Sequence, residues 1–446
     1  MKIDKPLITG TIEQPGVSAS FICSDHKFIF LPGEHEFNPI NCGVLKQENG
    51  FIRGTTHQGN CILIYSPDDI ELRPTFTLDT WIYIIFNGDY KDKCSSIRFK
   101  SGVLKSLFIQ RSLTINGWSK TGNHDYEISD DSVKIQIDDG LVDHIKLYSE
   151  VRWRESIREG SSLQNNGVNL ELVFKKKQSI PEVFKKYYQN IVTLCEFMTF
   201  RKSISFEKVE LTEYKENVKH HGFMRIADCF IKSEFQIEND RDRVRCITFN
   251  ELGNHASELY KMITKRNAKR SKFCVDFIPE NKGDLSWMTG KKIRDICTSV
   301  EVEAGLSGVE VINNEDFLSV VSEIKKVLHE RKDCLTEKEY NFLKGNIEHW
   351  NGPAAELAYG LYNKFLKEVE PLLNIVHLAE LSFDDINELI KIRNTLTHGG
   401  HIIINERDAE SALIMMGVVY ASVLKRCGCE SAQIAEWFKN GLLTVI

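Results

Sequence analysis

Hydrophobic and polar residues follow two different patterns along this chain, with a change near residue 284. From residue 6 to about 178, short runs of β-branched and aromatic residues alternate with turn-forming pairs such as Asn49-Gly50 and Asn87-Gly88. The runs are 18–23, 27–31, 60–65, 75–86, 132–137, 141–149 and 168–174. Many short strands at this spacing predict an antiparallel sandwich or barrel, and hence a β-rich N-terminal domain over residues 1–178.

Residues 179–283 combine both patterns, and we expect them to form a mixed α/β middle region. Pro181 stands at the N1 position of a predicted helix, where proline is favoured. Strand-like runs follow at 204–211 and 224–231, and a further helix is expected over 250–266. The apolar face of the first helix consists of Phe184, Tyr187, Tyr188, Ile191, Leu194, Cys195 and Met198.

The most basic stretch of the middle region is a candidate RNA-binding segment. Its five cations are Lys265, Arg266, Lys269, Arg270 and Lys272. Such a cluster can neutralise several phosphates and draw RNA toward an active site. The simpler alternative is a solvated loop whose charges serve solubility.

From about residue 284 to residue 446, apolar residues recur at helical spacing. This pattern predicts an all-α bundle of about six helices with short connections. Thr336 and Glu339 have the spacing of a capping box, and Asn405 is expected to cap a long helix. Because that last helix is apolar nearly all round, it is typical of a buried core or a dimer seam.

One helix of the bundle carries an unusual charge on its apolar face. Ser382 and Asp385 predict a capping box at its start, and Gly399-Gly400 predicts its end. Arg393 falls on the stripe of apolar positions, where an unpaired guanidinium is costly to bury. The apolar stripe consists of Ile386, Leu389, Ile390, Leu396 and Thr397.

His398 follows Arg393 by five positions, which places the two side chains about 140° apart on a straight helix. They can converge if the helix frays at His398, or a second copy of the chain can supply the missing half of a site. The structural alternative is an arginine paired with an acid and a histidine that caps the helix. The functional alternative combines a phosphate-binding arginine with a proton-transferring histidine, with Asn394 orienting the histidine or the phosphate.

The pattern Arg393-Asn394-x3-His398 resembles the signature of the HEPN superfamily of small helical domains, many of which are metal-independent ribonucleases. The whole chain, including the short piece Phe30-Leu31-Pro32-Gly33, resembles the ApeA-type abortive-infection proteins of bacterial anti-phage defence. In that group a β-rich region precedes a C-terminal HEPN domain. The resemblance therefore implies a ribonuclease domain over residues 284–446 and a regulatory N-terminal domain that senses a phage-derived trigger.

The resemblance also implies a homodimer that places two motifs in one cleft and leaves 2′,3′-cyclic phosphate and 5′-OH ends. Arg393, Asn394 and His398 would be catalytic, without a metal or another cofactor, and the substrate would be host RNA, with tRNA as a candidate. A non-catalytic HEPN module that binds RNA, nucleotide or a protein partner is the main alternative. A purely structural oligomerisation domain would leave Arg393 without a purpose.

Composition bears on the kind of binding site and on the cellular compartment. A net charge of −6 means that any nucleic-acid site must be a local patch. Neither a signal peptide nor an apolar run long enough to span a bilayer is present, and twelve scattered cysteines fit reduced thiols. We therefore expect a cytoplasmic protein with no membrane partner.

No metal or nucleotide motif stands out in the sequence. A structural zinc at Cys427 and Cys429 is not favoured, because no second ligand pair lies nearby at zinc spacing. His26, His35 and His57 are expected to be surface or packing residues.

Overall fold

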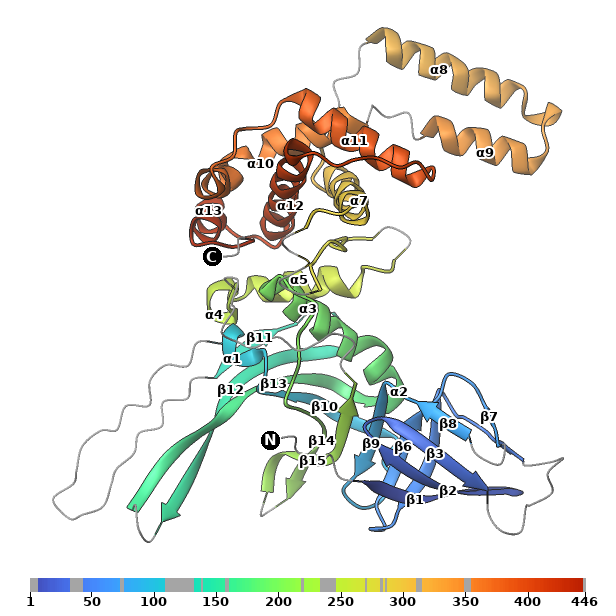
Figure 1. Cartoon of the computed structure of the whole chain (residues 1–446), viewed down its shortest axis with the longest axis vertical. Coiled ribbons are helices and arrows are strands. Elements are labelled where there is room, and N and C mark those ends of the chain that lie inside the picture. The colour runs from blue at the N-terminus through green and yellow to red at the C-terminus, as the bar shows by residue number, and fades with distance from the viewer. Residues whose placement is uncertain are drawn as a thin grey trace. The chain divides into compact units, whose positions relative to one another are not determined.

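The computed structural model describes residues 7–32, 43–72, 76–108, 132–137, 139–156, 160–217, 220–232, 246–268, 271–280, 284, 287–309, 315–348 and 354–443. The chain divides into two compact units (Figure 1). Unit 1 comprises Met1–Asn239 and Cys246–Lys261, and unit 2 comprises Asp240–Arg245 and Met262–Ile446.

A large antiparallel sheet organises unit 1 and confirms the predicted β-rich region. Thirteen strands follow the order β11-β12-β13-β10-β14-β15-β9-β6-β5-β1-β2-β3-β8, and β4 and β7 form a small second sheet. The strands are β1 Ile8–Gln14, β2 Val17–Ser24, β3 Lys27–Pro32, β4 Val44–Leu45, β5 Phe51–Thr56, β6 Cys61–Tyr65, β7 Ile70–Glu71, β8 Phe76–Asp79, β9 Ile82–Phe86, β10 Lys93–Lys100, β11 Val133–Gln136, β12 Val142–Ser156, β13 Gly160–Ser179, β14 Lys208–Asn217 and β15 His220–Ile231.

Strands β14 and β15 come from the predicted middle region, yet they lie inside this sheet between β10 and β9. Residues 179–283 therefore share their sheet with residues 1–178. The domain boundaries at 178 and 283 remain sequence-based predictions.

The strands from β1 to β9 form a curled lobe with its own apolar core (Figure 1). The β2–β3 hairpin turns at Asp25 and His26, which both have positive φ, as a type I′ turn requires. The core includes Ile12, Phe21, Phe28, Phe30, Ile52, Ile62, Ile64 and Tyr83.

The sheet from β11 to β15 has one apolar and one polar face. Ile97 on β10 pairs in register with Leu172 on β13 and Leu211 on β14, and all three side chains are fully buried. Helix α3 (Gln189–Thr199) and the π-helical turn η2 (Val183–Tyr188) flank the sheet, and η2 places Tyr188 5.9 Å from the ring of Phe99. Short helices α1 (Leu104–Leu107), α2 (Ile180–Glu182), α4 (Phe249–Leu252) and α5 (His255–Thr264) complete this region.

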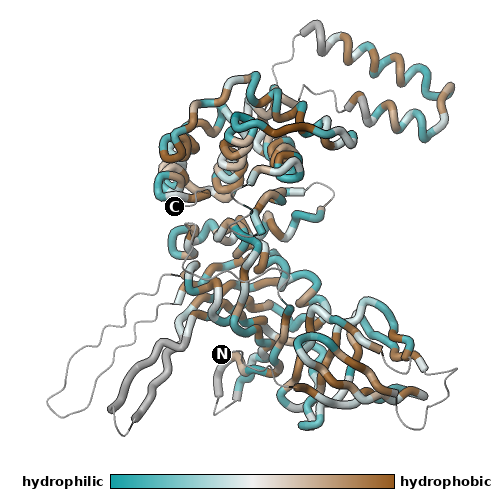
Figure 2. The backbone as a smooth tube through the Cα atoms, in the orientation of Figure 1, coloured by the Kyte–Doolittle hydropathy of each residue, from teal (hydrophilic) through white to brown (hydrophobic). Residues whose placement is uncertain are grey.

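Unit 2 is helical, as predicted. The long helix α12 (Glu406–Arg426) is buried along most of its length and packs against four neighbouring helices, α7, α10, α11 and α13. Its apolar residues appear as brown stretches in Figure 2. The other helices are α7 Gly290–Leu306, α8 Glu315–Glu330, η3 Lys332–Cys334, α9 Glu337–Glu348, α10 Ala354–Val376, α11 Phe383–Thr397 and α13 Ser431–Lys439.

Within the residue ranges given above, no helix is long and apolar enough to cross a membrane.

Candidate functional site

Helix α11 and its C-cap carry the three predicted catalytic residues, and the helix N-terminus is firmly anchored. Ser382 accepts a hydrogen bond from the Asp385 backbone N–H, and the Asp385 carboxylate accepts one from the Ser382 N–H. The predicted capping box is thus confirmed. Arg407 of α12 donates to both Asp385 carboxylate oxygens at 2.9 Å and to the Glu380 carbonyl at 2.9 Å. These bonds from Arg407, with those from Ser382, hold the pKa of Asp385 well below its usual range.

The C-terminus of α11 ends in a Schellman motif. The Gly400 N–H donates to the Thr395 carbonyl at 2.9 Å, and the Gly399 N–H donates to the Leu396 carbonyl at 3.2 Å. Gly399 has a φ of 79°, a conformation that favours glycine. The predicted glycine stop is therefore confirmed.

Arg393 lies half-buried on α11 and forms an ion pair with Glu301 of α7. Its side chain is 21% exposed and that of Glu301 is 36% exposed. The Arg393 Nε is buried without a hydrogen-bond partner among the described residues. The guanidinium is thus held by one carboxylate, and its hydrogen-bonding capacity is not fully used.

Cys297 precedes Glu301 by one helical turn on α7, and the charge of Arg393 acts on its thiol. Burial raises the pKa of the Cys297 thiol to about 12, with Arg393 acting in the opposite direction. At neutral pH this side chain is therefore a protonated thiol rather than a thiolate nucleophile.

His398 is exposed at the C-cap of α11, and Asn394 is exposed one turn earlier. The helix does not fray before His398, because the His398 N–H still donates to the Asn394 carbonyl at 3.1 Å. No hydrogen bond or ion pair joins Arg393 to His398 in the part of the chain that the structure describes. Within one chain, the offset expected for a straight helix therefore still applies.

A second ion pair fixes α7 to α12. Arg426 donates to the two carboxylate oxygens of the fully buried Glu303 at 3.0 and 2.6 Å, and Ser422 donates to the same carboxylate at 2.7 Å. Burial raises the pKa of Glu303, while Arg426 opposes this shift. Because Glu303 lies two residues from Glu301, this ion pair also fixes the α7 segment that holds Arg393.

The sequence did not identify Glu301 as a partner of Arg393. A signal for it exists, because Glu301 follows the buried Cys297 by four positions and therefore lies near the inward face of α7. Ninety-two residues separate it from Arg393, so only the packing of the two helices reveals which arginine it meets.

The predicted RNA-binding segment is described only in part. Lys265 and Lys272 are exposed and Arg266 is half-buried. The Lys272 carbonyl accepts a hydrogen bond from Arg426 at 3.1 Å, which fixes the backbone at the end of the segment. Lys269 and Arg270 lie outside the described residues.

Cys427 and Cys429 are buried, and burial raises the pKa of Cys429 to about 11. Among the residues that the structure describes, no group of three or more His, Cys, Asp or Glu side chains is placed to hold a metal. His26 is buried against Tyr83, with a ring separation of 5.1 Å, and His57 is exposed, as predicted for packing and surface residues. His35 lies outside the described residues.

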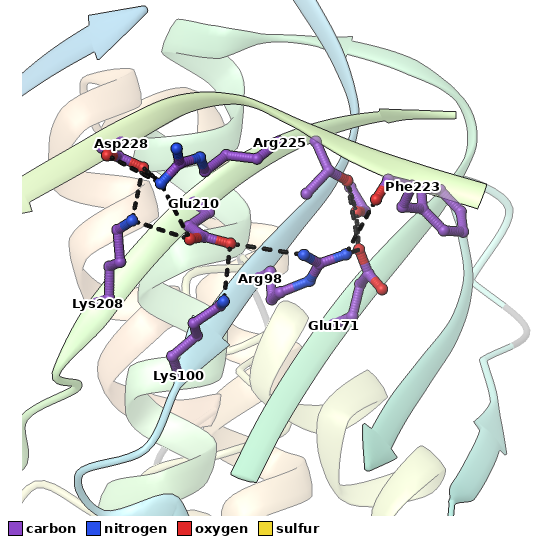
Figure 3. Close-up of polar contacts among 10 residues, drawn as sticks. Arg98, Lys100, Glu171, Lys208, Glu210, Phe223, Arg225 and Asp228 are labelled. Carbon is purple, nitrogen blue, oxygen red and sulfur yellow. Dashed lines mark hydrogen bonds and ion pairs between the residues drawn. The ribbon is translucent and has the colours of Figure 1, made fainter. Parts of the chain in front are cut away.

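A cluster of charged residues that the sequence did not indicate covers the polar face of the β10–β15 sheet (Figure 3). At its centre the buried Glu210 carboxylate meets Lys208 at 3.0 Å, Lys100 at 3.4 Å, Arg98 at 3.5 Å and Arg225 at 3.9 Å. Burial of one anion among four cations is stabilising only while the set stays complete.

A second carboxylate extends this cluster across β13. Glu171 pairs with Arg98 at 3.1 Å and accepts hydrogen bonds from Ser96 at 2.6 Å and Thr212 at 3.3 Å. The partners come from β10, β13 and β14, whose register places them side by side. The cluster therefore specifies how these strands pair.

The chain matches no family model, and no curated protein or solved structure matches it either.

Proposed function

We propose that this protein is a metal-independent endoribonuclease of the HEPN type. The observation that carries the proposal is the arrangement on α11, where Arg393 is half-buried and His398 is exposed at the helix end. An arginine fixed by the scaffold and a histidine open to solvent are the two groups that metal-free RNA cleavage requires.

RNA supplies its own nucleophile, the 2′-OH, so the protein must manage protons and charge. His398 transfers protons, because imidazole can both accept and donate a proton. Arg393 stabilises the negative charge that develops on the phosphorane, and Asn394 orients the histidine or the phosphate. The products are 2′,3′-cyclic phosphate and 5′-OH ends.

One chain offers one such histidine, whereas the reaction needs both a base and an acid. A homodimer through the helical unit supplies the second copy across a symmetric interface. Arg393 and His398 point about 140° apart on a single straight helix, and in a dimer the arginine of one copy can act with the histidine of the other.

Glu301 bears directly on this mechanism. Its carboxylate competes with a substrate phosphate for the Arg393 guanidinium, so binding of RNA must displace or share this ion pair. An enzyme held in this way has low activity until another event shifts the ion pair. This fits a defence toxin that cuts host RNA, with tRNA as a candidate, in the cytoplasm during abortive infection.

The proposal is tested by incubating the purified full-length protein with total RNA in EDTA, alongside His398→Ala. The matched control is His401→Ala, which removes an exposed histidine just beyond the same helix. We expect slow cleavage by the wild type and the control, because Glu301 restrains Arg393, and a further loss of at least a hundredfold in His398→Ala, the usual contribution of a general acid or base. Equal cleavage by all three proteins would contradict the assignment.

A non-catalytic HEPN module that binds RNA, nucleotide or a protein partner is the second candidate. The observation that favours it is the Arg393–Glu301 ion pair, which already satisfies much of the charge of the arginine. In that case labelled RNA would bind the protein without being cut, and His398→Ala would bind as the wild type does.

A further inference from the structure

A large open pocket of unit 1 lies between the curled lobe and the start of the α2–η2 helix, far in sequence from α11. It has a volume of about 1120 Å³. Ligand sites typically occupy about 300–1,000 Å³, so it can hold a molecule with more than one ring system.

Aromatic rings form one wall of this pocket. Tyr65 lies edge-on to Phe51 at 5.6 Å and to Trp81 at 5.5 Å, and Trp81 lies edge-on to Phe184 at 6.4 Å. On β6, Leu63 and Tyr65 alternate with Ile62 and Ile64 of the lobe core, so this strand is apolar on both faces, whereas on β5 the face of Phe51 also carries the exposed Arg53. A second apolar face with rings at a pocket is suited to stacking a flat ligand.

Cations and carboxylates stand beside the rings. The Arg53 guanidinium lies 4.5 Å from the centre of the Tyr90 ring, and Lys185 is exposed on η2. A guanidinium stacked on a ring keeps its N–H donors at its edge, where they suit phosphate oxygens. Asp92 and Glu182 also line the pocket and can accept hydrogen bonds from amino groups.

The rim of the pocket is rigid before any ligand arrives. The Gln14 side-chain amide donates to the Lys46 carbonyl at 2.8 Å and accepts from the Lys46 N–H at 2.7 Å. Asp69 accepts from the Lys46 amine and from the Gln47 N–H, each at 2.9 Å. The opposite wall includes the π-helical turn η2, a form that is frequent at functional sites. Such preorganisation lowers the entropic cost of binding.

We propose that this pocket binds a mononucleotide, with its base stacked on the aromatic wall at Trp81 and its phosphate held by Arg53 and Lys185. The carboxylates of Asp92 and Glu182 recognise amino groups of the base. This site is separate from the one on α11 and does not depend on the nuclease proposal.

Calorimetric titration of the full-length protein with AMP, GMP, CMP and UMP tests the site, with adenosine, guanosine, cytidine, uridine and ribose 5-phosphate as partial ligands. We expect at least one nucleoside monophosphate to bind one-to-one and ribose 5-phosphate, which lacks a base, not to bind. Trp81→Ala should weaken binding about tenfold or more, since base stacking is lost. Arg53→Gln should weaken the nucleotide but not its nucleoside.

Two control variants show whether binding is specific to this pocket. Trp287→Ala removes a tryptophan that is 75% exposed in unit 2 and should bind as the wild type does. His398→Ala should also bind normally, and a loss there would place the nucleotide on α11 and overturn the proposal. Arg53 is exposed, so Arg53→Gln remains a test even if Trp81→Ala melts early.

Two other results would overturn the proposal. One is the absence of binding by all four nucleotides, or binding that neither pocket variant changes. The other is saturable binding of a short tryptophan-containing peptide that nucleotides do not displace, which would assign the pocket to a peptide.

Discussion

Among the residues that the structure describes, Arg393 forms its ion pair with Glu301, and that contact gives the sharpest residue-level prediction. Glu301→Gln removes the negative charge but keeps the shape of the side chain. Because the freed guanidinium can bind phosphate, we expect RNA affinity to rise several-fold. Stability should fall by no more than about 1 kcal/mol, because the ion pair is only partly buried. Fluorescence anisotropy with a labelled RNA oligonucleotide measures the affinity.

The control for this change is Glu388→Gln, which breaks an exposed ion pair between Glu388 and Lys391 on α11, the helix of Arg393. It should leave RNA affinity unchanged. If both variants bind RNA equally, the effect of Glu301 comes from net charge, and its contact with Arg393 has no special role.

Asp385 gives a prediction about pH. Its folded-state pKa lies below the unfolded value of about 3.9, so its contribution is complete above that value and is lost as pH falls through the folded-state pKa. Asp385→Asn should therefore lower the free energy of unfolding at pH 7 by about 1–2 kcal/mol, since the charge-assisted bonds to Arg407 are weakened. The difference should shrink as pH falls below about 4.

Chemical denaturation at a series of pH values measures this effect. Asp384→Asn is the matched control, because Asp384 is an exposed neighbour in the same first turn. A difference between Asp385→Asn and the wild type that is constant from pH 7 to pH 3 would show that Arg407 does not stabilise the ionised form.

At the scale of elements, the end of α11 depends on a glycine in the left-handed conformation. Gly399→Ala should destabilise the protein by about 1 kcal/mol, because alanine is strained at a φ of 79°. Gly305→Ala should instead stabilise the protein, since Gly305 lies within helix α7 and a Cβ there meets nothing within 4 Å. Urea unfolding compares the two, and a stabilised Gly399→Ala would contradict the Schellman motif.

The polar face of the sheet gives a second prediction at this scale. Glu210→Ala removes the buried anion that the half-buried Arg98, Lys100 and Lys208 share, so we expect a loss of about 3–5 kcal/mol. Glu207→Ala, which removes an exposed partner of Lys105, should cost less than about 1 kcal/mol. Similar losses in both variants would mean that the cluster around Glu210 is not a stabilising unit.

These elements also show what the sequence could and could not predict. The capping boxes at Ser382 and Thr336 and the glycine stop after His398 are local, so they were read correctly from neighbouring residues. The sequence placed Thr397 on the apolar stripe of α11, but its side chain is exposed, because the last turn of the helix leaves the core. The partners of Arg393 and Glu210 depend on long-range packing and register, which no local pattern contains.

At the scale of the whole molecule, a β-rich unit and a helical unit were predictable from the change of periodicity near residue 284. The place of β14 and β15 was not, because the sequence between residues 204 and 231 shows only that strands occur there. Their insertion between β10 and β9 joins the predicted N-terminal and middle regions through one sheet. The sequence also did not indicate the pocket in unit 1, whose wall includes the rings of Phe51, Tyr65 and Trp81.

The central claim, that the helical unit cuts RNA without a metal, is tested most directly by the chemistry of the fragment ends. Total RNA is digested in EDTA, and the fragments are ligated with an enzyme that joins only 2′,3′-cyclic phosphate to 5′-OH ends. The account predicts ligation-competent fragments from the wild type and none from His398→Ala. Fragments with 5′-phosphate and 3′-OH ends, or equal yields from His398→Ala, would contradict it.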